Sequence, residues 1–273
     1  MAKLSLTKTA FTTGNYYKSM NEALKSINGD YHMLHYPFYK DMDDSFSQAQ
    51  KNLIEYCIEK FSLLKDKDLL DIGCGNGVVA LYVSDNHPIN SVTGVDLNAN
   101  NVKIANEEKK KRNKNNVNFL EGDAQNLSHI ESNSIDIIIN IESAFHYPHK
   151  DLFIDEIHRI LKPGGQFIIA DILTTKKEST LLKSWKRKMN FHHWSFDKYQ
   201  DAFNRSHLNL CEHDDITDKV ILGFKMYKNY FNKFSKNGHL RNPILKLFFI
   251  INVKLNIRLL KRKRRYYIFL GEK

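Results

Sequence analysis

The sequence predicts an α/β protein whose core is a mostly parallel sheet with helices on both faces. Between residues 68 and 175, apolar segments of strand length alternate with amphipathic segments of helix length, which is typical of βαβ units. The apolar segments are rich in Ile, Leu and Val, as strands covered on both faces must be. A glycine-rich turn joins the first of these strands to the helix that follows.

Composition supports one compact protein rather than a disordered or membrane-spanning chain. The 273 residues are 42% hydrophobic and 12% aromatic, which suits a packed core. Cys57, Cys74 and Cys211 are far apart and form no C-x-x-C pair, a pattern that suits a reducing compartment. No signal peptide and no apolar run of membrane-spanning length is visible. We therefore expect a cytoplasmic protein.

Residues 1–64 are predicted to form an N-terminal cap segment and a helix. The cap segment is irregular and carries aromatic side chains between Tyr16 and Tyr39. Apolar residues then recur at helical spacing from Ser45 to Leu64. Ser45 and Gln48 have the spacing of a capping box.

Residues 65–175 are predicted to form the core. The expected strands are Leu69–Gly73, Val92–Leu97, Val117–Leu120, Ile135–Ile141 and Gln166–Leu173, and the expected helices are Val78–Ser84, Asn100–Arg112 and Leu152–Leu161. The Lys-Pro-Gly-Gly run at 162–165 ends the last of these helices.

Residues 176–273 are predicted to supply a cap insertion and the last strands and helices of the same domain. Here the expected helices are Lys176–Asn190, Phe196–His207, Asp218–Phe234 and Pro243–Leu260, and the expected strands are Leu208–Thr217 and Tyr266–Leu270. Aromatic residues of this insertion, with those of the N-terminal segment, would line an apolar pocket.

Positive charge is concentrated in this last third, which has 23 basic and 8 acidic residues in a chain of net charge +10. It indicates either an anionic partner or a solvated lysine-rich surface. The apolar run Ile244–Ile251 precedes the basic cluster Lys261–Arg265, as in an interfacial membrane anchor. A core or dimer helix that leads into a final strand explains the same residues. Peripheral membrane contact and a homodimer both stay open.

Three glycines at alternate positions, Gly73, Gly75 and Gly77, follow the first strand of the core. Glycine permits a tight turn and leaves room for a ligand beside the backbone. The next helix offers unpaired N–H groups at its start. A dinucleotide site would need G-x-G-x-x-G, but Val78 occupies the last position.

The G-x-G-x-G run, preceded by Asp71, resembles motif I of class I S-adenosylmethionine (SAM)-dependent methyltransferases. Asp96 ends the second strand, Gly122-Asp123-Ala124 follows the third, and Asn140 to Pro148 follows the fourth. These motifs stand in the family's order from about Leu69 to Leu173, just over a third of the chain. The match is most similar to the small-molecule branch, which includes sugar and polyketide O-methyltransferases, sterol C-methyltransferases and phosphoethanolamine N-methyltransferases.

The resemblance implies a Rossmann-like sheet of seven mostly parallel strands, a helical cap, and SAM as cofactor. It implies that Asp96 binds the ribose hydroxyls and that Asp123 contacts the adenine amino group. Cys74 is expected to fill space rather than act as a nucleophile. The expected cofactor-binding residues are Asp71, Gly73, Cys74, Gly75, Gly77, Asp96, Leu97, Asp123, Ala124, Asn140 and Glu142.

His146 and Asp171 are the expected catalytic residues. His146 follows the fourth strand, and a histidine can accept a proton near neutral pH. Asp171 lies toward the end of the neighbouring strand, where it could orient the imidazole. Related natural-product O-methyltransferases have a histidine and an aspartate at matching positions. The alternative is that His146 only packs against or hydrogen-bonds the substrate.

The sequence favours O-methylation of a small-molecule or lipid-like substrate. The tetrad that begins at Asn140 is not the N/D-P-P-F/Y tetrad of nucleobase amino methyltransferases, and no Pro-Cys pair is present. Nucleic acid is therefore a disfavoured partner, and no metal site is expected. The alternatives are N- or C-methylation of a small molecule or lipid headgroup, an RNA-modifying enzyme, and a non-catalytic partner subunit.

Overall fold

The computed structural model describes residues 18, 21–22, 33–175, 190–236 and 243–273. The predicted helix Lys176–Asn190 lies outside these residues except for its last one, as do Tyr16 and Tyr31 of the predicted cap.

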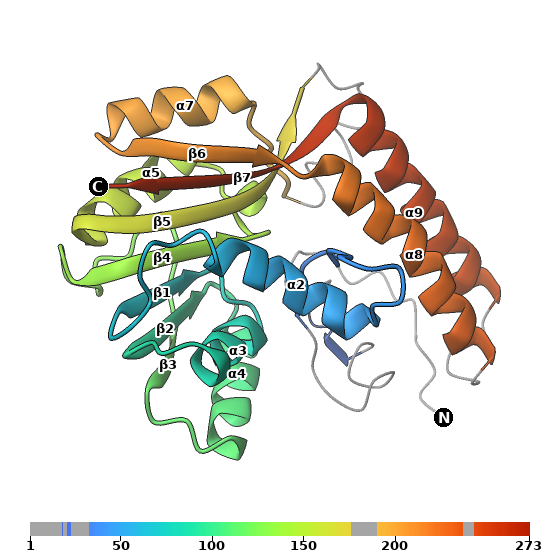
Figure 1. Cartoon of the computed structure of the whole chain (residues 1–273), viewed down its shortest axis with the longest axis horizontal. Helices are drawn as coiled ribbons and strands as arrows, with labels where there is room; N and C mark the ends of the chain where they lie inside the picture. Colours follow the sequence, from blue (N-terminus) through green and yellow to red (C-terminus); the bar gives the residue numbers. More distant parts are fainter. Residues whose placement is uncertain (1–17, 19–20, 23–32, 176–189, 237–242) are drawn as a thin grey trace.

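Seven strands form one sheet in the order β3-β2-β1-β4-β5-β7-β6 (Figure 1). The strands are β1 (Asp68–Ile72), β2 (Ser91–Asp96), β3 (Val117–Glu121), β4 (Ile135–Ile141), β5 (Leu161–Thr174), β6 (Asn209–Asp215) and β7 (Arg264–Glu272). The first five run parallel, and β7 is antiparallel to both β5 and β6. The predicted seven-stranded, mostly parallel Rossmann-like sheet is confirmed.

Two apolar layers cover the two faces of this sheet. The helices are α2 (Phe46–Ile58), α3 (Val78–Asn86), α4 (Ala99–Lys111), α5 (Lys150–Ile160), α7 (Phe196–Arg205), α8 (Thr217–Lys236) and α9 (Pro243–Arg262), with the 3-10 turn η1 (Ala144–His146). Side chains of α2 and α3 join one buried cluster, and those of α5 and α7 join the other. Ile137, Ile139 and Ile141 of β4 belong to one cluster and Ile138 to the other, since strand side chains point to opposite faces.

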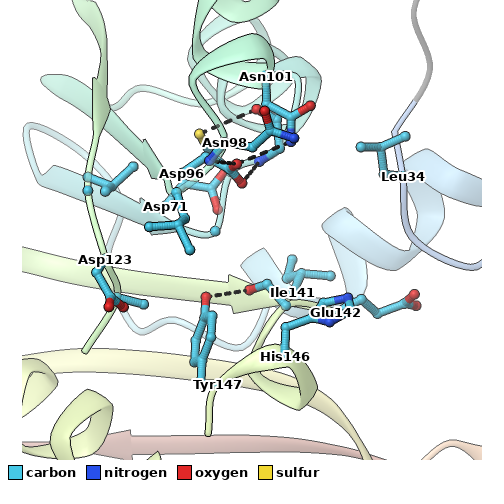
Figure 2. Close-up of a pocket in the computed structure, with 18 of the residues that line it drawn as sticks. Leu34, Asp71, Asp96, Asn98, Asn101, Asp123, Ile141, Glu142, His146 and Tyr147 are labelled. Atoms are coloured by element: carbon cyan, nitrogen blue, oxygen red, sulfur yellow. Dashed lines mark hydrogen bonds between the residues drawn. The ribbon is translucent and has the colours of Figure 1, made fainter. Parts of the chain in front are cut away.

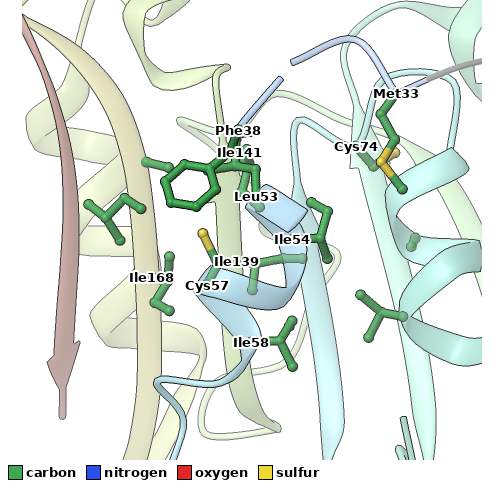
Figure 3. Close-up of a cluster of buried hydrophobic side chains, with 14 of the residues drawn as sticks. Met33, Phe38, Leu53, Ile54, Cys57, Ile58, Cys74, Ile139, Ile141 and Ile168 are labelled. Carbon is green, nitrogen blue, oxygen red and sulfur yellow. The ribbon is translucent and has the colours of Figure 1, made fainter. Parts of the chain in front are cut away.

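Helix α2 lies on one face through Leu53, Ile54 and Ile58, each at most 1% exposed (Figure 3). Burying such a side chain fully contributes about 1.5–3 kcal/mol. Ser45 caps the helix as predicted, because its side chain accepts a hydrogen bond from the Gln48 N–H. The helix is shorter than predicted: Phe61 is still buried, but it packs from a turn beyond the helix end.

The C-terminal segment is tied into the sheet. Helices α8 and α9 lie side by side at one end of the sheet (Figure 1), and α9 leads into β7, which inserts between β5 and β6. Val253 and Leu260 of α9 are buried in the core, whereas Ile251 and Leu255 are exposed. Among the described residues, no helix is long and apolar enough to cross a membrane.

Candidate active site

A cavity of about 550 Å³ lies beyond the carboxyl ends of β1, β2 and β4 (Figure 2). The strand order reverses between β1 and β4, and ligands of open α/β sheets bind at such a switch point. The cavity is lined by Leu34, His35, Asp71, Gly73, Cys74, Gly75, Asn76, Val79, Val95, Asp96, Leu97, Asn98, Asn101, Gly122, Asp123, Ala124, Gln125, Ile141, Glu142, Ser143, His146, Tyr147, Pro148 and Asn190.

The glycine-rich turn forms one wall of the cavity. Gly73 has φ +77°, and a Cβ there would lie 2.6 Å from the Tyr147 hydroxyl oxygen. Only glycine tolerates both this positive φ and the lack of space for a Cβ atom. Gly77 starts α3 but does not line the cavity. A Cβ at Gly77 would lie 2.5 Å from the Ala105 Cβ, so this glycine permits close helix packing, and its predicted cofactor contact stays a prediction.

Asp96 connects the end of β2 to the glycine turn. Its Oδ2 accepts a hydrogen bond from the Gly75 N–H at 2.9 Å. Its Oδ1 accepts one from the Asn98 N–H at 2.9 Å and one from the Asn101 side-chain amide at 3.1 Å. Burial raises the pKa of Asp96, and these three hydrogen bonds oppose that shift. The carboxylate therefore lies at the cavity wall in a fixed orientation.

Three buried asparagines, which the sequence analysis did not identify, extend this network. The Asn76 amide donates to Asn21 Oδ1 at 2.9 Å, and the Asn21 amide donates to Asn101 Oδ1 at 3.1 Å. All three are at most 4% exposed. Asn21 thereby joins the N-terminal segment to both the glycine turn and Asp96. Asparagine is common on protein surfaces, so no sequence signal distinguished these three.

Asp123 lies at the far end of the cavity from Glu142 and Leu34 (Figure 2), and Leu97 also lines the cavity. The Asp123 Oδ1 accepts hydrogen bonds from both the backbone N–H and the side-chain amide of Gln125, each at 2.9 Å. The Leu97 side chain is 69% exposed. The cavity lining therefore includes a carboxylate and an exposed apolar side chain.

Glu142 follows β4 with φ +53°. Its Oε1 accepts a hydrogen bond from the Tyr36 N–H at 2.8 Å and one from the Tyr266 hydroxyl at 3.0 Å. Burial raises the pKa of Glu142 to about 8, against the effect of these two hydrogen bonds. The N-terminal segment and β7 thus meet at this carboxyl group.

His146 ends the short turn η1 and lines the cavity. Its Nδ1 lies 3.2 Å from the Asn190 carbonyl oxygen. Because a carbonyl only accepts hydrogen bonds, Nδ1 carries the ring proton and Nε2 carries the lone pair. Burial lowers the pKa of His146 to about 4, and the nearby Lys150 and His192 act in the same direction.

Asp171 does not touch the imidazole of His146, contrary to the predicted contact. The side chain is fully buried and lies outside the cavity, where its Oδ2 accepts a hydrogen bond from the Tyr199 hydroxyl at 2.6 Å. Asp171 projects toward the α5–α7 layer, so its carboxylate meets Tyr199 instead. It also accepts a hydrogen bond from the backbone N–H of Phe145. Asp171 therefore holds the turn that carries His146.

Asn140 lies next to the cavity wall, and its predicted cofactor contact stays a prediction. It is fully buried and does not line the cavity. Its amide donates to the Ile72 carbonyl at 2.8 Å, to the Ser143 hydroxyl at 2.7 Å and to the Tyr147 hydroxyl at 3.1 Å. These contacts fix two side chains that face the glycine turn. Asn140 therefore holds Ser143 and Tyr147, which line the cavity, without lining it itself.

Comparison with known proteins assigns the domain. Residues 70–169 match the family model described as a methyltransferase domain. Methyltransferase GfsG from Streptomyces halstedii is 27% identical over 219 residues, which cover 76% of each chain. The phthiotriol/phenolphthiotriol dimycocerosates methyltransferase of Mycobacterium leprae is 37% identical over 138 residues, and the chain spans only 49% of that relative.

Residues 70–169 of this chain form a SAM-dependent methyltransferase domain. Solved structures share the whole fold at low identity. A putative sarcosine dimethylglycine methyltransferase from Galdieria sulphuraria has a TM-score of 0.81 at 18% identity, covering 96% of this chain and 98% of that one. The [4+2]-cyclase SpnF has a TM-score of 0.77 at 21% identity, covering 97% and 96%. Since that neighbour is a cyclase, the shared fold alone does not fix the reaction.

The residues of the methyltransferase cavity fit SAM. Asp71 is 3% exposed, and its Oδ2 has no hydrogen-bond partner. Burial and the neighbouring Asp96 raise the pKa of Asp71 to about 8. A buried carboxyl group without a partner is costly, and a cationic ligand group would relieve that cost. SAM carries both an ammonium and a sulfonium group.

Proposed function

We propose that this methyltransferase transfers the SAM methyl group to a hydroxyl group of a small-molecule or lipid-like acceptor, with His146 as general base. The names of sequence relatives support this acceptor class. Besides the phthiotriol enzyme, a fatty-acid O-methyltransferase from Mycolicibacterium smegmatis is 34% identical over 108 residues, 38% of its length.

The described residues suggest how SAM is held. Asp96 would accept hydrogen bonds from the ribose hydroxyls, and Asp123 would accept one from the adenine amino group. Leu97 and Ala124 would contact the adenine ring. Asp71 would face the cationic methionine part, next to the glycine turn. SAM supplies an activated methyl group, so the protein must align the acceptor and remove its proton.

The observation that carries the proposal is that His146 lines the same cavity as the glycine turn and Asp96. The acceptor oxygen would form a bond to the methyl carbon as the carbon–sulfur bond breaks. The hydroxyl proton would pass to Nε2 of His146, and the sulfonium would become the neutral thioether of S-adenosylhomocysteine (SAH). A lowered pKa keeps His146 in its base form at neutral pH. Asp171 would act only as a positioning residue, through Phe145.

The test compares His146→Ala with His149→Ala, which alters an exposed histidine outside the cavity. We expect kcat of His146→Ala to fall by about 100-fold, the lower end of general-base effects. SAM binding by both variants should match the wild type. Transfer of labelled methyl from SAM to 4-hexylresorcinol, which has two hydroxyl groups, provides the assay. If His146→Ala keeps near wild-type turnover, the base assignment is wrong.

The pH profile supplies a second readout for the same assignment. Because the pKa of His146 is lowered to about 4, its base form persists as the pH falls from 7 to 5. The wild-type rate should therefore not fall along a titration near pH 6.5, where an ordinary histidine would be protonated. If the wild-type rate falls around pH 6.5 and this fall disappears in His146→Gln, the pKa of His146 is not lowered by burial.

N- or C-methylation is the second candidate reaction, favoured by the geranyl diphosphate C-methyltransferase of Streptomyces coelicolor A3(2). That structure has a TM-score of 0.75 at 17% identity and covers 95% of this chain and 96% of that one. Metabolite extracts incubated with labelled SAM, followed by NMR of the labelled product, would show which atom receives the methyl group. A methyl group on nitrogen or carbon would replace the O-methylation proposal.

Cytoplasmic location, peripheral membrane contact and a homodimer also stay proposals. The membrane proposal has some support from α9, where Ile251 and Leu255 are exposed beside the exposed Lys254 and Arg258. Co-sedimentation with phosphatidylserine vesicles, compared with neutral phosphatidylcholine vesicles, tests it. Equal retention on both would count against an electrostatic contact.

A further inference from the structure

The segment that carries His35 is fixed against the cavity by two elements. The Gln50 side chain of α2 donates hydrogen bonds to the carbonyl oxygens of Met33 and His35, at 2.5 and 3.0 Å. The Tyr36 N–H donates to Glu142 at 2.8 Å. His35 itself lines the cavity and is 5% exposed. Its position is therefore set by tertiary contacts that hold the backbone on both sides of the ring.

The hydrogen bonds of His35 determine which ring nitrogen is a donor. Its Nδ1 lies 3.0 Å from the Tyr36 carbonyl oxygen, so Nδ1 carries the proton. Burial lowers the pKa of His35 to about 4, and the ring is neutral at pH 7. Nε2 then has a lone pair, and this buried atom has no hydrogen-bond partner. Such an atom is unsatisfied until a ligand donates a hydrogen bond to it.

Glu142 can donate a hydrogen bond to a ligand, whereas His35 can accept one. Both hydrogen bonds that it accepts, from Tyr36 and Tyr266, go to Oε1. Because burial raises its pKa to about 8, the carboxyl group is mostly protonated at pH 7. With Oε1 accepting twice, the proton belongs on Oε2, which can donate to a ligand. Glu142 also lines the cavity.

No lysine or arginine occurs among the described residues that line the cavity, whereas four carboxyl groups do: Asp71, Asp96, Asp123 and Glu142. A bound anion would thus meet no cation from this part of the chain. Phosphate and carboxylate groups are usually recognised by arginine or lysine.

Building on the proposed O-methylation, we infer that His35 and Glu142 are specificity residues that select an acceptor presenting an uncharged hydroxyl group and disfavour carboxylate or phosphate acceptors. The hydroxyl group that is methylated gives its only proton to His146, so the group selected here is a second hydroxyl group of the acceptor. That group can donate to Nε2 of His35 and accept from Oε2 of Glu142. A carboxylate or phosphate ester dianion has no proton to donate, so it leaves Nε2 of His35 unsatisfied. Sites built around such a hydrogen bond reject ligands that lack the matching group.

The test measures binding of three matched probes to SAH-loaded protein at pH 7 by calorimetry: 4-hexylphenol, 4-hexylbenzoate and 4-hexylphenyl phosphate. The wild type should bind the phenol at least about tenfold more tightly than either anion, as expected for one hydrogen bond to a buried group. His35→Leu should lose that preference. His35→Gln, which places an amide oxygen near the position of Nε2, should restore most of it.

Two results would overturn the inference: equal or tighter binding of an anionic probe by the wild type, or an unchanged preference in His35→Leu. The wild-type comparison needs no variant, so a folding defect in His35→Leu cannot remove the test. Failure of the proposed function is separately visible. A protein that binds 4-hexylphenol selectively but transfers no methyl group to 4-hexylresorcinol, which has two hydroxyl groups, would contradict O-methylation and leave the selectivity inference standing.

Discussion

The two ends of the cavity are built in different ways. At the proposed cofactor end, Asp71 and Asp96 lie at the carboxyl ends of β1 and β2 and Asp123 follows β3, within about fifty residues of one another along the chain. At the acceptor end, Glu142 follows β4 but is held by Tyr36 from the N-terminal segment and by Tyr266 from the last strand. A local motif builds the first end, and distant segments must meet to build the second.

This difference has a functional consequence. The cofactor end serves a ligand of fixed shape, and its turn conformations leave few choices of residue. The acceptor end can change when the N-terminal segment or β7 changes, with no effect on the glycine turn. A fold of this kind can therefore keep its cofactor while its acceptor varies. Four predictions test this separation, from the largest expected effect to the smallest.

Asp96→Ala should have the largest effect of the four, a loss of SAH affinity at the cofactor end. Loss of two hydrogen bonds that the ribose hydroxyls donate to the carboxylate should weaken SAH binding by about 100-fold or more, since each charged hydrogen bond contributes about 1.5–3 kcal/mol. Calorimetry with SAH measures this. Asp85→Ala removes a surface carboxylate that pairs with Arg112 and Lys114, and it should bind SAH normally. If Asp96→Ala binds SAH with near wild-type affinity, Asp96 does not bind the ribose hydroxyls.

Gly73→Ala should destabilise the protein more than Gly164→Ala. Both glycines have positive φ, +77° and +75°, so both substitutions add backbone strain of about 1 kcal/mol or more. Only at Gly73 would the new methyl group overlap Ser143 and Tyr147; nothing lies within 4 Å at Gly164. Urea unfolding should show a further loss of about 2 kcal/mol for Gly73→Ala. Equal losses would mean that the turn tolerates a side chain.

Asp71→Asn should change how stability depends on pH. The pKa of Asp71 is raised to about 8, so between pH 7 and 9 the folded protein holds a proton that the unfolded chain has released. The free energy of unfolding therefore falls as the pH rises through 8. Without SAM, the wild type should lose about 1 kcal/mol more than Asp71→Asn between pH 7 and 9.

Saturating SAM should remove most of this difference, because its cationic groups favour the ionised Asp71. Glu142→Gln is the matched control, since Glu142 also has a raised pKa but lies at the acceptor end. The free energy of unfolding of Glu142→Gln should still depend on pH through Asp71, and SAM should still reduce that dependence. If SAM removed only the part of the pH dependence that comes from Glu142, the cofactor and acceptor ends would have been assigned the wrong way round.

Asn21→Ala should have the smallest effect of the four, a modest loss of SAM affinity. It removes the hydrogen bonds to Asn76 and Asn101 that tie the N-terminal segment to the cofactor end. We expect SAM affinity to fall by about fivefold, as for one or two neutral hydrogen bonds. Glu22→Ala, an exposed change on the next residue, should leave the affinity unchanged. A loss above 100-fold would mean that this segment contributes as much as Asp96.

The sequence by itself determined the α/β class, the parallel core strands and the cofactor end. Strand periodicity and the spacing of Gly73, Gly75 and Asp96 are local properties, and parallel strands bring their carboxyl ends together by geometry alone. The same reasoning was wrong about Asp171, whose carboxylate meets Tyr199 and not His146, and it did not show that Gly77 and Asn140 lie outside the cavity lining. A residue near a strand end can point to either face, and only packing shows which.

Tertiary structure decided the acceptor end. His35 and Tyr266 are more than two hundred residues apart in sequence, and no periodicity connects them. They meet near Glu142 because β7 inserts beside β5 and because α2 holds the N-terminal segment against the sheet. Long-range packing also determines the buried, neutral state of His35, since desolvation is a property of the folded surroundings rather than of the residue.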